Sequence, residues 1–293
     1  MGERTGIAWC DHTFNPWWGC TKVSPACKNC YAETMDARLG GGHWGDRAPR
    51  RFFGAAHWRA PFRWNAAAER AGVRRRVFCA SMADVFEDRP ELEGHRNELW
   101  EVINETENLD WLLLTKRPEN IERMLPAPLI TREMAAQHGG NPQPFFENVW
   151  LGTTVESQEY AIERIPHLLA NPAVVHFISA EPLLGELDLE PWLHVDGISW
   201  VITGSESGRG KRPQNIDWFR SLRDQCAAYG TPFFLKQAEP AVDRENGLPL
   251  ISIGHGSRTK ARGELIDEPY LDGEQHVAIP VPRTFRRENF EVS

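Results

Sequence analysis

Six short apolar runs recur along this chain of 293 residues, each followed by a polar or glycine-containing turn and then by a more helical segment. The runs are rich in Val, Ile, Phe, Trp and Leu and mostly lack strict alternation, which is typical of strands buried on both faces of a parallel sheet. Strands that alternate with helices predict an α/β fold with right-handed crossovers. Six such strands favour a full or partial (β/α) TIM-type barrel over an open sheet. The runs cover residues 76–81, 110–115, 148–154, 173–180, 197–203 and 231–236.

The segments between the runs carry apolar residues at helical spacing. In residues 157–172, Pro166 is expected to kink the helix or to end its first part. The segment after the fifth run offers Asn215 or Asp217 as the residue that caps the start of a helix, and Gly230 as its stop.

The chain divides into a large and a small part. Residues 1–238 are predicted to form the barrel domain, with a cysteine-containing cluster loop at 14–33 and an insertion rich in arginine and aromatic residues near 43–76. A first strand is possible before Cys10, at residues 5–9. The rest, 239–293, is rich in Gly and Pro and is expected to form a short irregular appendage packed on the barrel.

Composition places the chain among ordinary globular proteins, with 41% hydrophobic and 25% charged residues. No apolar run approaches the roughly 18 residues that suggest a membrane span. The first residues lack the apolar stretch of a secretory signal, so we expect a cytoplasmic protein without a membrane partner. A net charge of -8 argues against attraction of the whole molecule to nucleic acid.

Three cysteines, Cys20, Cys27 and Cys30, follow the spacing C-x6-C-x2-C. In a cytoplasmic chain of this size, a tight cysteine cluster more often binds a metal or takes part in catalysis than forms disulfides. A structural zinc site takes four ligands, and Cys10 or His12 could complete the set. Alternatively, three thiolates could hold a four-iron cluster and leave one iron open for a substrate.

Polar side chains follow each predicted strand. In a parallel barrel the carboxyl ends of the strands meet at one mouth, where functional side chains gather, so these residues predict a common polar pocket. The strand ends supply Ser81 and Asp84; Thr115, Lys116 and Arg117; Thr153, Thr154 and Glu156; Ser179 and Glu181; Ser205, Glu206 and Ser207; and Lys236 and Gln237.

Several stretches resemble the phage-associated three-Cys-motif family, a group of radical-SAM-like proteins largely without assigned function. They include "FNPWWGCTKVSPACKNCYAE", "LLLTKRP", "VWLGTTVES", "SAEPLLGELDL" and "WVITGSESGRGKRP", and they run in order from residue 14 to about 237. Radical SAM enzymes in general use C-x3-C-x2-C, whereas the wider first gap here is shared by the family. An aromatic residue normally precedes the last cysteine, but here Asn29 does.

The resemblance implies a radical-SAM-type barrel with a [4Fe-4S] cluster on Cys20, Cys27 and Cys30. It also implies S-adenosylmethionine as cofactor, and an electron donor such as flavodoxin or ferredoxin. Reductive cleavage of S-adenosylmethionine would then be followed by hydrogen abstraction from a substrate. The candidates for binding S-adenosylmethionine are Ser81, Asp84, Thr115, Lys116, Thr153, Glu156, Glu181, Ser205 and Glu206, and those for a catalytic role are Glu156, Glu181, Glu206 and Lys236.

The substrate is expected to be a nucleotide or a nucleic-acid base, in modification or repair. Between Asp46 and Arg76 there are nine arginines against two acidic residues, interleaved with aromatic side chains. Arginine with aromatics suits phosphate contact and base stacking. The competing interpretation of this segment, Arg47–Arg76, is a solvated arginine-rich face over a small aromatic core.

Two other functions compete with the radical enzyme. One is a zinc-stabilised nucleic-acid-binding protein without redox chemistry, which would need Cys10 beside the other three cysteines. The other is a barrel hydrolase that uses Glu181 and Glu206 as acid and base.

Overall fold

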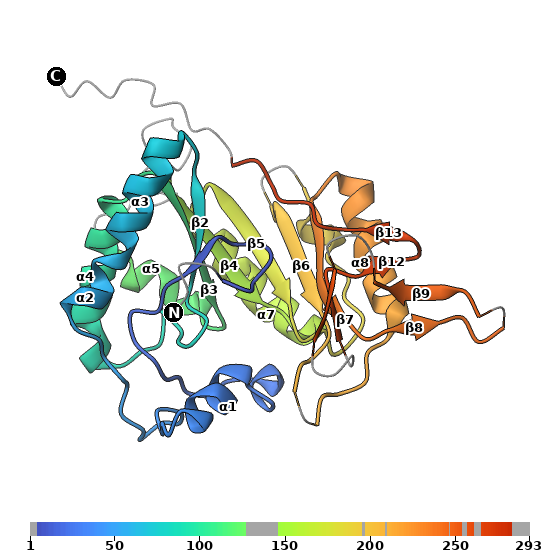
Figure 1. Ribbon diagram of the computed structural model, residues 1–293, viewed down its shortest axis with the longest axis horizontal. Coiled ribbons are helices and arrows are strands. Elements are labelled where there is room, and N and C mark those ends of the chain that lie inside the picture. The colour runs from blue at the N-terminus through green and yellow to red at the C-terminus, as the bar shows by residue number, and fades with distance from the viewer. Residues whose placement is uncertain are drawn as a thin grey trace.

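The computed structural model describes residues 5–126, 146–194, 197–208, 210–245, 247–253, 257–260 and 265–282. Its main feature is a curled nine-stranded sheet in the order β1-β2-β3-β4-β5-β6-β7-β11-β10 (Figure 1). Neighbouring strands from β1 to β7 pair in parallel. The strands are β1 (His12–Thr13), β2 (Arg75–Cys79), β3 (Leu109–Thr115), β4 (Val149–Thr154), β5 (Val175–Ala180), β6 (Trp200–Gly204) and β7 (Phe233–Ala238).

This architecture confirms the predicted α/β class as a half-barrel with both faces of its sheet covered. Each of the six predicted runs forms a strand, with ends that differ from the prediction by three residues or fewer. Every residue of β4 and of β5 is buried, which explains why these runs do not alternate. The first strand, however, comes after Cys10 rather than before it, because residues 7–10 form a turn in which the amide of Cys10 donates to the carbonyl of Ile7 at 3.3 Å.

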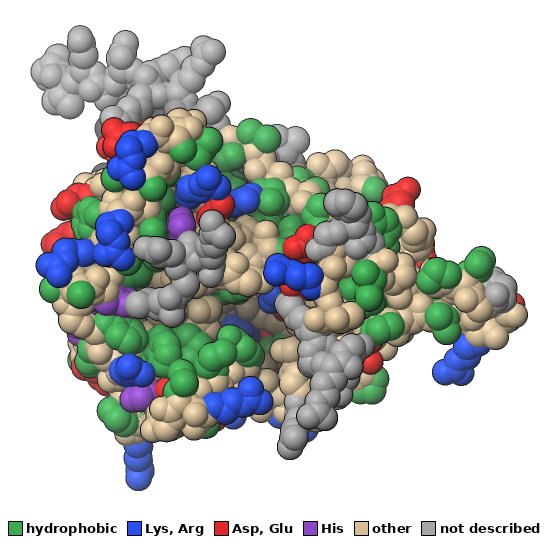
Figure 2. Space-filling model, in the orientation of Figure 1, with side chains coloured by type: hydrophobic (Ala, Val, Ile, Leu, Met, Phe, Trp, Pro, Cys, Tyr) green, Lys and Arg blue, Asp and Glu red, His purple; other side chains and the backbone are tan. Residues whose placement is uncertain are grey.

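Helices cover the convex face of the sheet (Figure 1). In the view of Figure 2, Lys and Arg side chains lie along the flank that α3 forms. The α-helices are α1 (Tyr31–Arg38), α2 (Ala55–Trp58), α3 (Ala60–Ala71), α4 (Glu93–Asn104), α5 (Ile121–Met124), α7 (Gln158–Leu169) and α8 (Ile216–Tyr229). Within the described ranges, four 3-10 turns accompany them: η1 (Pro25–Cys27), η2 (Pro90–Leu92), η3 (Pro118–Asn120) and η4 (Glu190–Trp192). The segment 43–76 therefore contains α3, the crossover helix that leads from β1 to β2.

The ends of α8 agree with the prediction from sequence, whereas the end of α7 differs from it. The Asn215 side chain accepts a hydrogen bond from the amide of Asp217, and Gly230 ends α8 in the left-handed conformation at φ 67°. Helix α7 continues through Pro166 to Leu169, so of the two expected effects of this proline the end of the helix is wrong, and the kink stays a prediction. A proline removes the bond to the carbonyl four residues earlier, and here that residue, Ile162, is exposed to water.

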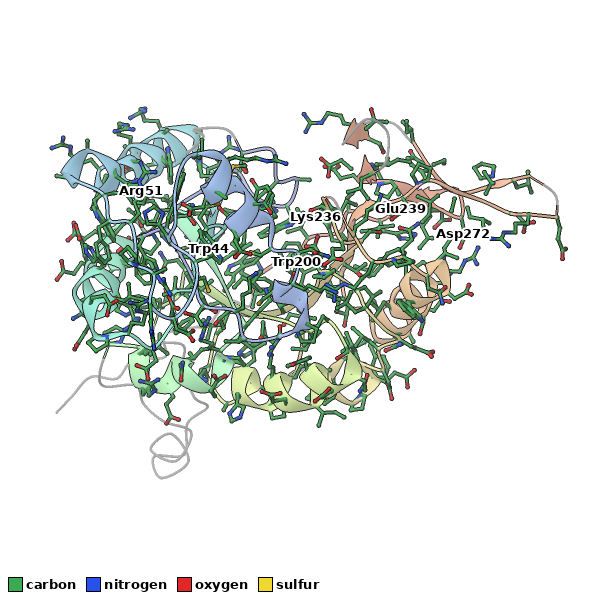
Figure 3. All side chains as sticks on the ribbon, turned by 90° about the horizontal axis from the view of Figure 1, so that it is seen from below. Trp44, Arg51, Trp200, Lys236, Glu239 and Asp272 are labelled. Atoms are coloured by element: carbon green, nitrogen blue, oxygen red, sulfur yellow. The ribbon has the colours of Figure 1, made fainter. Side chains whose placement is uncertain are left out.

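The concave face is filled by aromatic rings that we call the aromatic floor: Trp9, Trp150, Phe177, Trp200 and Phe234. Trp200 lies 6.0 to 6.2 Å from Trp9, Trp150 and Phe234, measured between ring centroids. Gly152 makes room for this packing, because a Cβ there would lie 2.3 Å from the Phe177 ring. In the view from below, Trp200 is seen near the middle of the curl (Figure 3). The floor therefore closes the interior of the half-barrel with apolar side chains.

The segment after residue 238 is more regular than its composition suggests. Strand β11 (Leu265–Asp267) pairs antiparallel with β7 and with β10 (Arg258–Lys260). A second sheet has the order β13-β12-β9-β8, from Glu274–Gln275, Tyr270–Leu271, Pro249–Ser252 and Ala241–Val242. Val277 forms an antiparallel bridge to Phe234, and the indole of Trp200 donates to the carbonyl of Ala278 at 2.9 Å. These contacts cover the edge of β7, which would otherwise expose unpaired backbone groups.

None of the helices in the described ranges is long and apolar enough to cross a membrane.

Candidate active site

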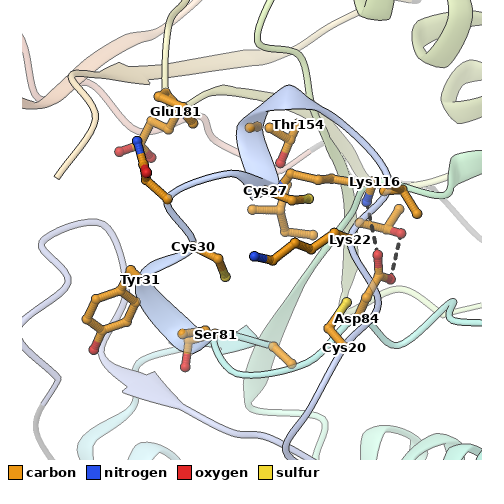
Figure 4. A pocket seen from close by; sticks show the side chains of 18 of the residues that line it. Cys20, Lys22, Cys27, Cys30, Tyr31, Ser81, Asp84, Lys116, Thr154 and Glu181 are labelled. Atoms are coloured by element: carbon orange, nitrogen blue, oxygen red, sulfur yellow. Dashed lines mark hydrogen bonds between the residues drawn. The ribbon is translucent and has the colours of Figure 1, made fainter. Parts of the chain in front are cut away.

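A pocket of about 250 Å³ lies at the carboxyl ends of the parallel strands, beneath the loop that carries the cysteines. In Figure 4, Cys20, Cys27 and Cys30 face the same space as Lys22 and Lys116. Fifteen of the residues singled out from sequence line this pocket: Cys20, Cys27, Cys30, Ser81, Asp84, Thr115, Lys116, Arg117, Thr154, Glu181, Ser205, Glu206, Ser207, Lys236 and Gln237. Thr153 and Glu156 are fully buried and do not line it.

The start of the cysteine loop is shaped by its glycine and its asparagine. Gly19 adopts φ 115°, and a Cβ there would lie 2.3 Å from the carbonyl oxygen of His43, so only glycine fits before Cys20. The buried Asn15 accepts a hydrogen bond from the amide of Met82 at 2.7 Å and donates to the hydroxyl of Ser81 at 3.2 Å. The motif "FNPWWGC" thus ties the loop to the end of β2.

A first anchor joins the loop to the end of β3. The Arg117 guanidinium donates to the Cys20 sulfur at 3.6 Å and to the Thr21 carbonyl at 2.7 Å, and it pairs with Asp84 at 2.8 Å. Asp84 also accepts the Thr115 hydroxyl at 2.7 Å and the Lys116 amide at 3.1 Å. These bonds occupy both of its carboxylate oxygens, so Asp84 orients Arg117 rather than offering a free carboxylate to a ligand.

The same neighbours perturb the titration of both partners. Burial, reinforced by Asp84, raises the pKa of the Cys20 thiol to about 12, despite the opposing effect of Arg117. Burial alone would lower the pKa of Arg117, but Asp84 and Cys20 raise it above its usual value. At neutral pH a neutral thiol therefore lies beside a charged guanidinium.

A second anchor joins the loop to the end of β4. The fully buried carboxylate of Glu156 accepts the amide of Ala26 at 3.2 Å and pairs with Arg164 at 3.0 Å. Arg164 also donates to the carbonyl of Thr154 at 2.8 Å. Glu156 therefore holds the turn that precedes Cys27, a role different from the cofactor contact expected from sequence.

A third anchor joins the loop to the turn after β6. Asn29 donates to the Glu206 carboxylate at 3.0 Å and to the Gly210 carbonyl at 2.9 Å. The amide and the side chain of Arg212 also donate to Glu206. Partial burial acts to raise the pKa of Glu206, but the bonds from Arg212 and Asn29 outweigh it and hold that pKa below its usual value. Both oxygens of Glu206 thus bind protein groups at the edge of the pocket.

The remaining polar groups of the pocket face one another across it. Lys236 and Glu181 form an ion pair at 2.9 Å, with side chains 22% and 12% exposed. In the part of the chain that the structure describes, the Lys116 ammonium makes no hydrogen bond or ion pair. The hydroxyls of Thr153 and Ser205 donate within the protein, to the Thr115 carbonyl and to Gln214. The pocket therefore offers an incoming molecule three thiols, a lysine–glutamate pair and a further lysine.

Sequence reasoning missed the loop anchors Ala26, Arg164 and Arg212. Asn29 gave a signal, since it stands between the last two cysteines where an aromatic residue is usual in radical SAM enzymes. The ion pairs of Arg164 and Arg212 depend on the fold, and the local sequence does not predict them.

The arginine segment is partly structural. Arg50 has a fully buried side chain that forms a two-pronged ion pair with Glu87, at 2.7 and 3.0 Å, and donates to the Thr21 hydroxyl at 3.0 Å. Arg74 pairs with Asp110, and Arg75 with Asp11. A phosphate contact from Arg50 is therefore excluded by its burial.

Replacing Arg50 by alanine is expected to lower the free energy of unfolding by roughly 3–5 kcal/mol, because the buried Glu87 would lose its partner. Urea denaturation measures this loss. Arg47→Ala is the control, since this exposed arginine should shift the free energy by no more than about 0.5 kcal/mol. Equal effects of the two changes would contradict the assignment.

Cys10 and His12 lie apart from the three cysteines. Cys10 is buried against the aromatic floor, with its thiol 3.8 Å from the carbonyl of Ile7, and His12 stacks on Trp64 at 4.5 Å between ring centroids. Neither residue lines the pocket. Among the described residues, no three His, Cys, Asp or Glu side chains are arranged to hold a single metal ion. Three thiols, those of Cys20, Cys27 and Cys30, line the pocket, and thiolates are ligands of both zinc and iron–sulfur clusters.

Comparison with known proteins gives one family and one distant structure. No curated protein sequence matches the chain. A mutant of spore photoproduct lyase is similar in structure, with a TM-score of 0.45 and 12% identity, over 90% of this chain and 69% of that one. The sequence model of a family described as "Protein of unknown function (DUF5131)" matches residues 4–280, which is nearly the whole chain. The chain therefore belongs to the DUF5131 family.

Proposed function

We propose that this protein is a radical-SAM-type enzyme, as its resemblance to the three-Cys-motif family implies. Cys20, Cys27 and Cys30 would hold a [4Fe-4S] cluster, and the adjoining pocket would take S-adenosylmethionine and the substrate. The observation that carries the proposal is the convergence of three thiols on one pocket with the polar ends of the parallel strands. A cubic cluster with three protein ligands keeps one iron open, whereas a closed zinc site would require a fourth ligand such as Cys10.

When bound, such a cluster supplies an electron to cleave a carbon–sulfur bond of S-adenosylmethionine, so that its adenosyl part can take a hydrogen atom from a substrate. The protein's own groups would orient and enclose the reactants. Glu181, held by its ion pair with Lys236, would accept hydrogen bonds from an amine or a ribose hydroxyl. Lys116 would bind a carboxylate or phosphate. Phe78, which packs in the same apolar cluster as the aromatic floor, lines the pocket and would keep water away from that side.

The hydrolase alternative fits the site less well. Its two carboxylates, Glu181 and Glu206, are each paired with a basic side chain. A general acid needs a pKa near the working pH, whereas the pKa of Glu206 lies below its usual value.

The experiment that tests the proposal is an absorption spectrum of the protein purified without oxygen, with iron, sulfide and zinc assayed alongside. We expect a brown protein with about four iron atoms per chain, whose visible absorption bleaches with dithionite. Formation of deoxyadenosine from S-adenosylmethionine is the next assay. A colourless protein that holds one zinc, even after reconstitution with iron and sulfide, would overturn the proposal.

A further inference from the structure

Arginines between residues 47 and 70 fall into two groups. Arg50 is buried in its ion pair with Glu87. Five others are exposed, and within the described ranges none of them pairs with Asp or Glu: Arg47, Arg51, Arg59, Arg63 and Arg70. Elsewhere, the exposed Arg123 and the half-buried Arg220 are paired with aspartates. Three more exposed arginines of the described residues, Arg38, Arg244 and Arg258, make no ion pair and lie apart in the sequence. Five of the eight exposed, unpaired arginines in the described residues thus lie within one stretch of 24 residues, in a chain whose net charge is -8.

Three of them form a stripe along α3. Arg59 precedes the first residue of the helix, and Arg63 and Arg70 follow at intervals of four and seven residues. At about 100° per residue, these positions fall within roughly 40° of one another around the helix axis. Over eleven residues the stripe extends about 16 Å. Because α3 leads back to the start of β2, Arg59 lies toward the carboxyl ends of the strands, where the pocket is, and Arg70 toward the opposite ends.

A stacking platform lies at the pocket end of this stripe. The Arg51 guanidinium lies over the rings of Trp18 and Phe53, at 4.8 and 5.4 Å from their centroids. The backbones of Trp18 and Arg51 exchange two hydrogen bonds of 2.9 Å, which places Arg51 next to the cysteine loop. In the view from below, Trp44, which lines the pocket, lies between Arg51 and Lys236 (Figure 3).

Exposed aromatic rings accompany the arginines. Phe52 is 40% exposed and stacks on His95 at 4.1 Å between ring centroids, and Phe62, which precedes Arg63 on α3, is 37% exposed. Guanidinium groups bind phosphates with two parallel hydrogen bonds, and aromatic or guanidinium planes stack on unpaired bases. An acidic protein would bind to the arginine charges alone, and its binding would not explain why aromatic rings are exposed beside them. The combination favours a nucleic acid whose bases are accessible.

We propose that Arg47, Arg51, Arg59, Arg63 and Arg70, the arginine track, bind the phosphodiester backbone of a single-stranded nucleic acid and direct it to the pocket. The inference names the substrate class of the proposed function and rests on that function for the reaction. The binding itself needs no cluster. Attraction is local, because the charge of the whole molecule is negative.

Fluorescence anisotropy with a labelled oligothymidine, measured over a series of salt concentrations, tests the proposal. The variant Arg59→Ala/Arg63→Ala/Arg70→Ala should bind roughly tenfold or more weakly, and its logarithmic salt slope should fall by about 2, for three lost contacts to a single strand. The matched control is Arg123→Ala/Arg220→Ala/Arg223→Ala, which removes the same charge from arginines paired with aspartates. The control should keep the slope of the unmodified protein.

Three outcomes would overturn the arginine track: no binding by the unmodified protein at low salt, an equal loss in both triple variants, or binding of an acidic protein such as flavodoxin in place of the oligonucleotide. A failure of cluster formation would instead contradict the proposed enzymatic function and would leave the anisotropy result unaffected. The two proposals therefore fail separately.

Discussion

Serine in place of Cys20, Cys27 or Cys30 is expected to abolish iron binding and deoxyadenosine formation. All three thiols line one pocket and would be the only protein ligands of the proposed cluster. Mutation of a residue that only hydrogen-bonds to a metal ligand lowers metal affinity by about 10- to 100-fold. Loss of a ligand itself should therefore lower the retained iron by at least that factor. Iron and sulfide assays on protein purified without oxygen measure the effect.

Cys10→Ala provides the matched control for this prediction. Cys10 is buried against the aromatic floor and does not line the pocket, so its removal should leave the iron content unchanged. Loss of the metal from Cys10→Ala, together with zinc in the unmodified protein, would support the four-ligand zinc site instead.

The second large effect is expected from Glu206→Gln. Both oxygens of this carboxylate accept hydrogen bonds, from Asn29 on the cysteine loop and from Arg212. Glutamine keeps the size of the side chain but turns a donor toward groups that also donate, and it removes the charge paired with Arg212. We expect cluster retention to fall by roughly 10- to 100-fold, with faster hydrogen exchange of the amides between Ala26 and Tyr31.

Two comparisons make this result informative. Glu190→Gln, at an exposed position, should leave both readouts unchanged. If Glu206→Gln keeps its cluster and its exchange rates but loses affinity for S-adenosylmethionine, Glu206 is a cofactor ligand, as the sequence suggested, and not an anchor of the loop. Hydrogen exchange in metal-free protein tests the anchor even if no cluster forms.

The sequence predicts the strands well because their signal is local. Runs of buried apolar residues mark β2 to β7, and the polar residues after them meet at one pocket because parallel strands end on the same side. The helix cap at Asn215 is likewise contained in a few neighbouring residues.

The roles of the acidic residues could not be predicted in the same way, because their partners are distant in the sequence. Glu156 contacts an amide 130 residues earlier, and Glu206 contacts Asn29 across 177 residues. A carboxylate that anchors a loop looks the same in sequence as one that binds a cofactor. Composition misleads similarly at Arg50, whose charge is cancelled by Glu87, 37 residues away.

The aromatic floor also bears on the order of events during turnover. Phe78 belongs both to the apolar cluster that contains the floor and to the lining of the pocket, so within the described residues the pocket is closed on that side. If the pocket takes two reactants, as the proposed function requires, the one bound against Phe78 would enter before its partner and leave after it, which predicts a compulsory-order kinetic mechanism. Saturation with the outer reactant would then trap the inner product, and the steady-state rate would decline at high concentrations of that reactant.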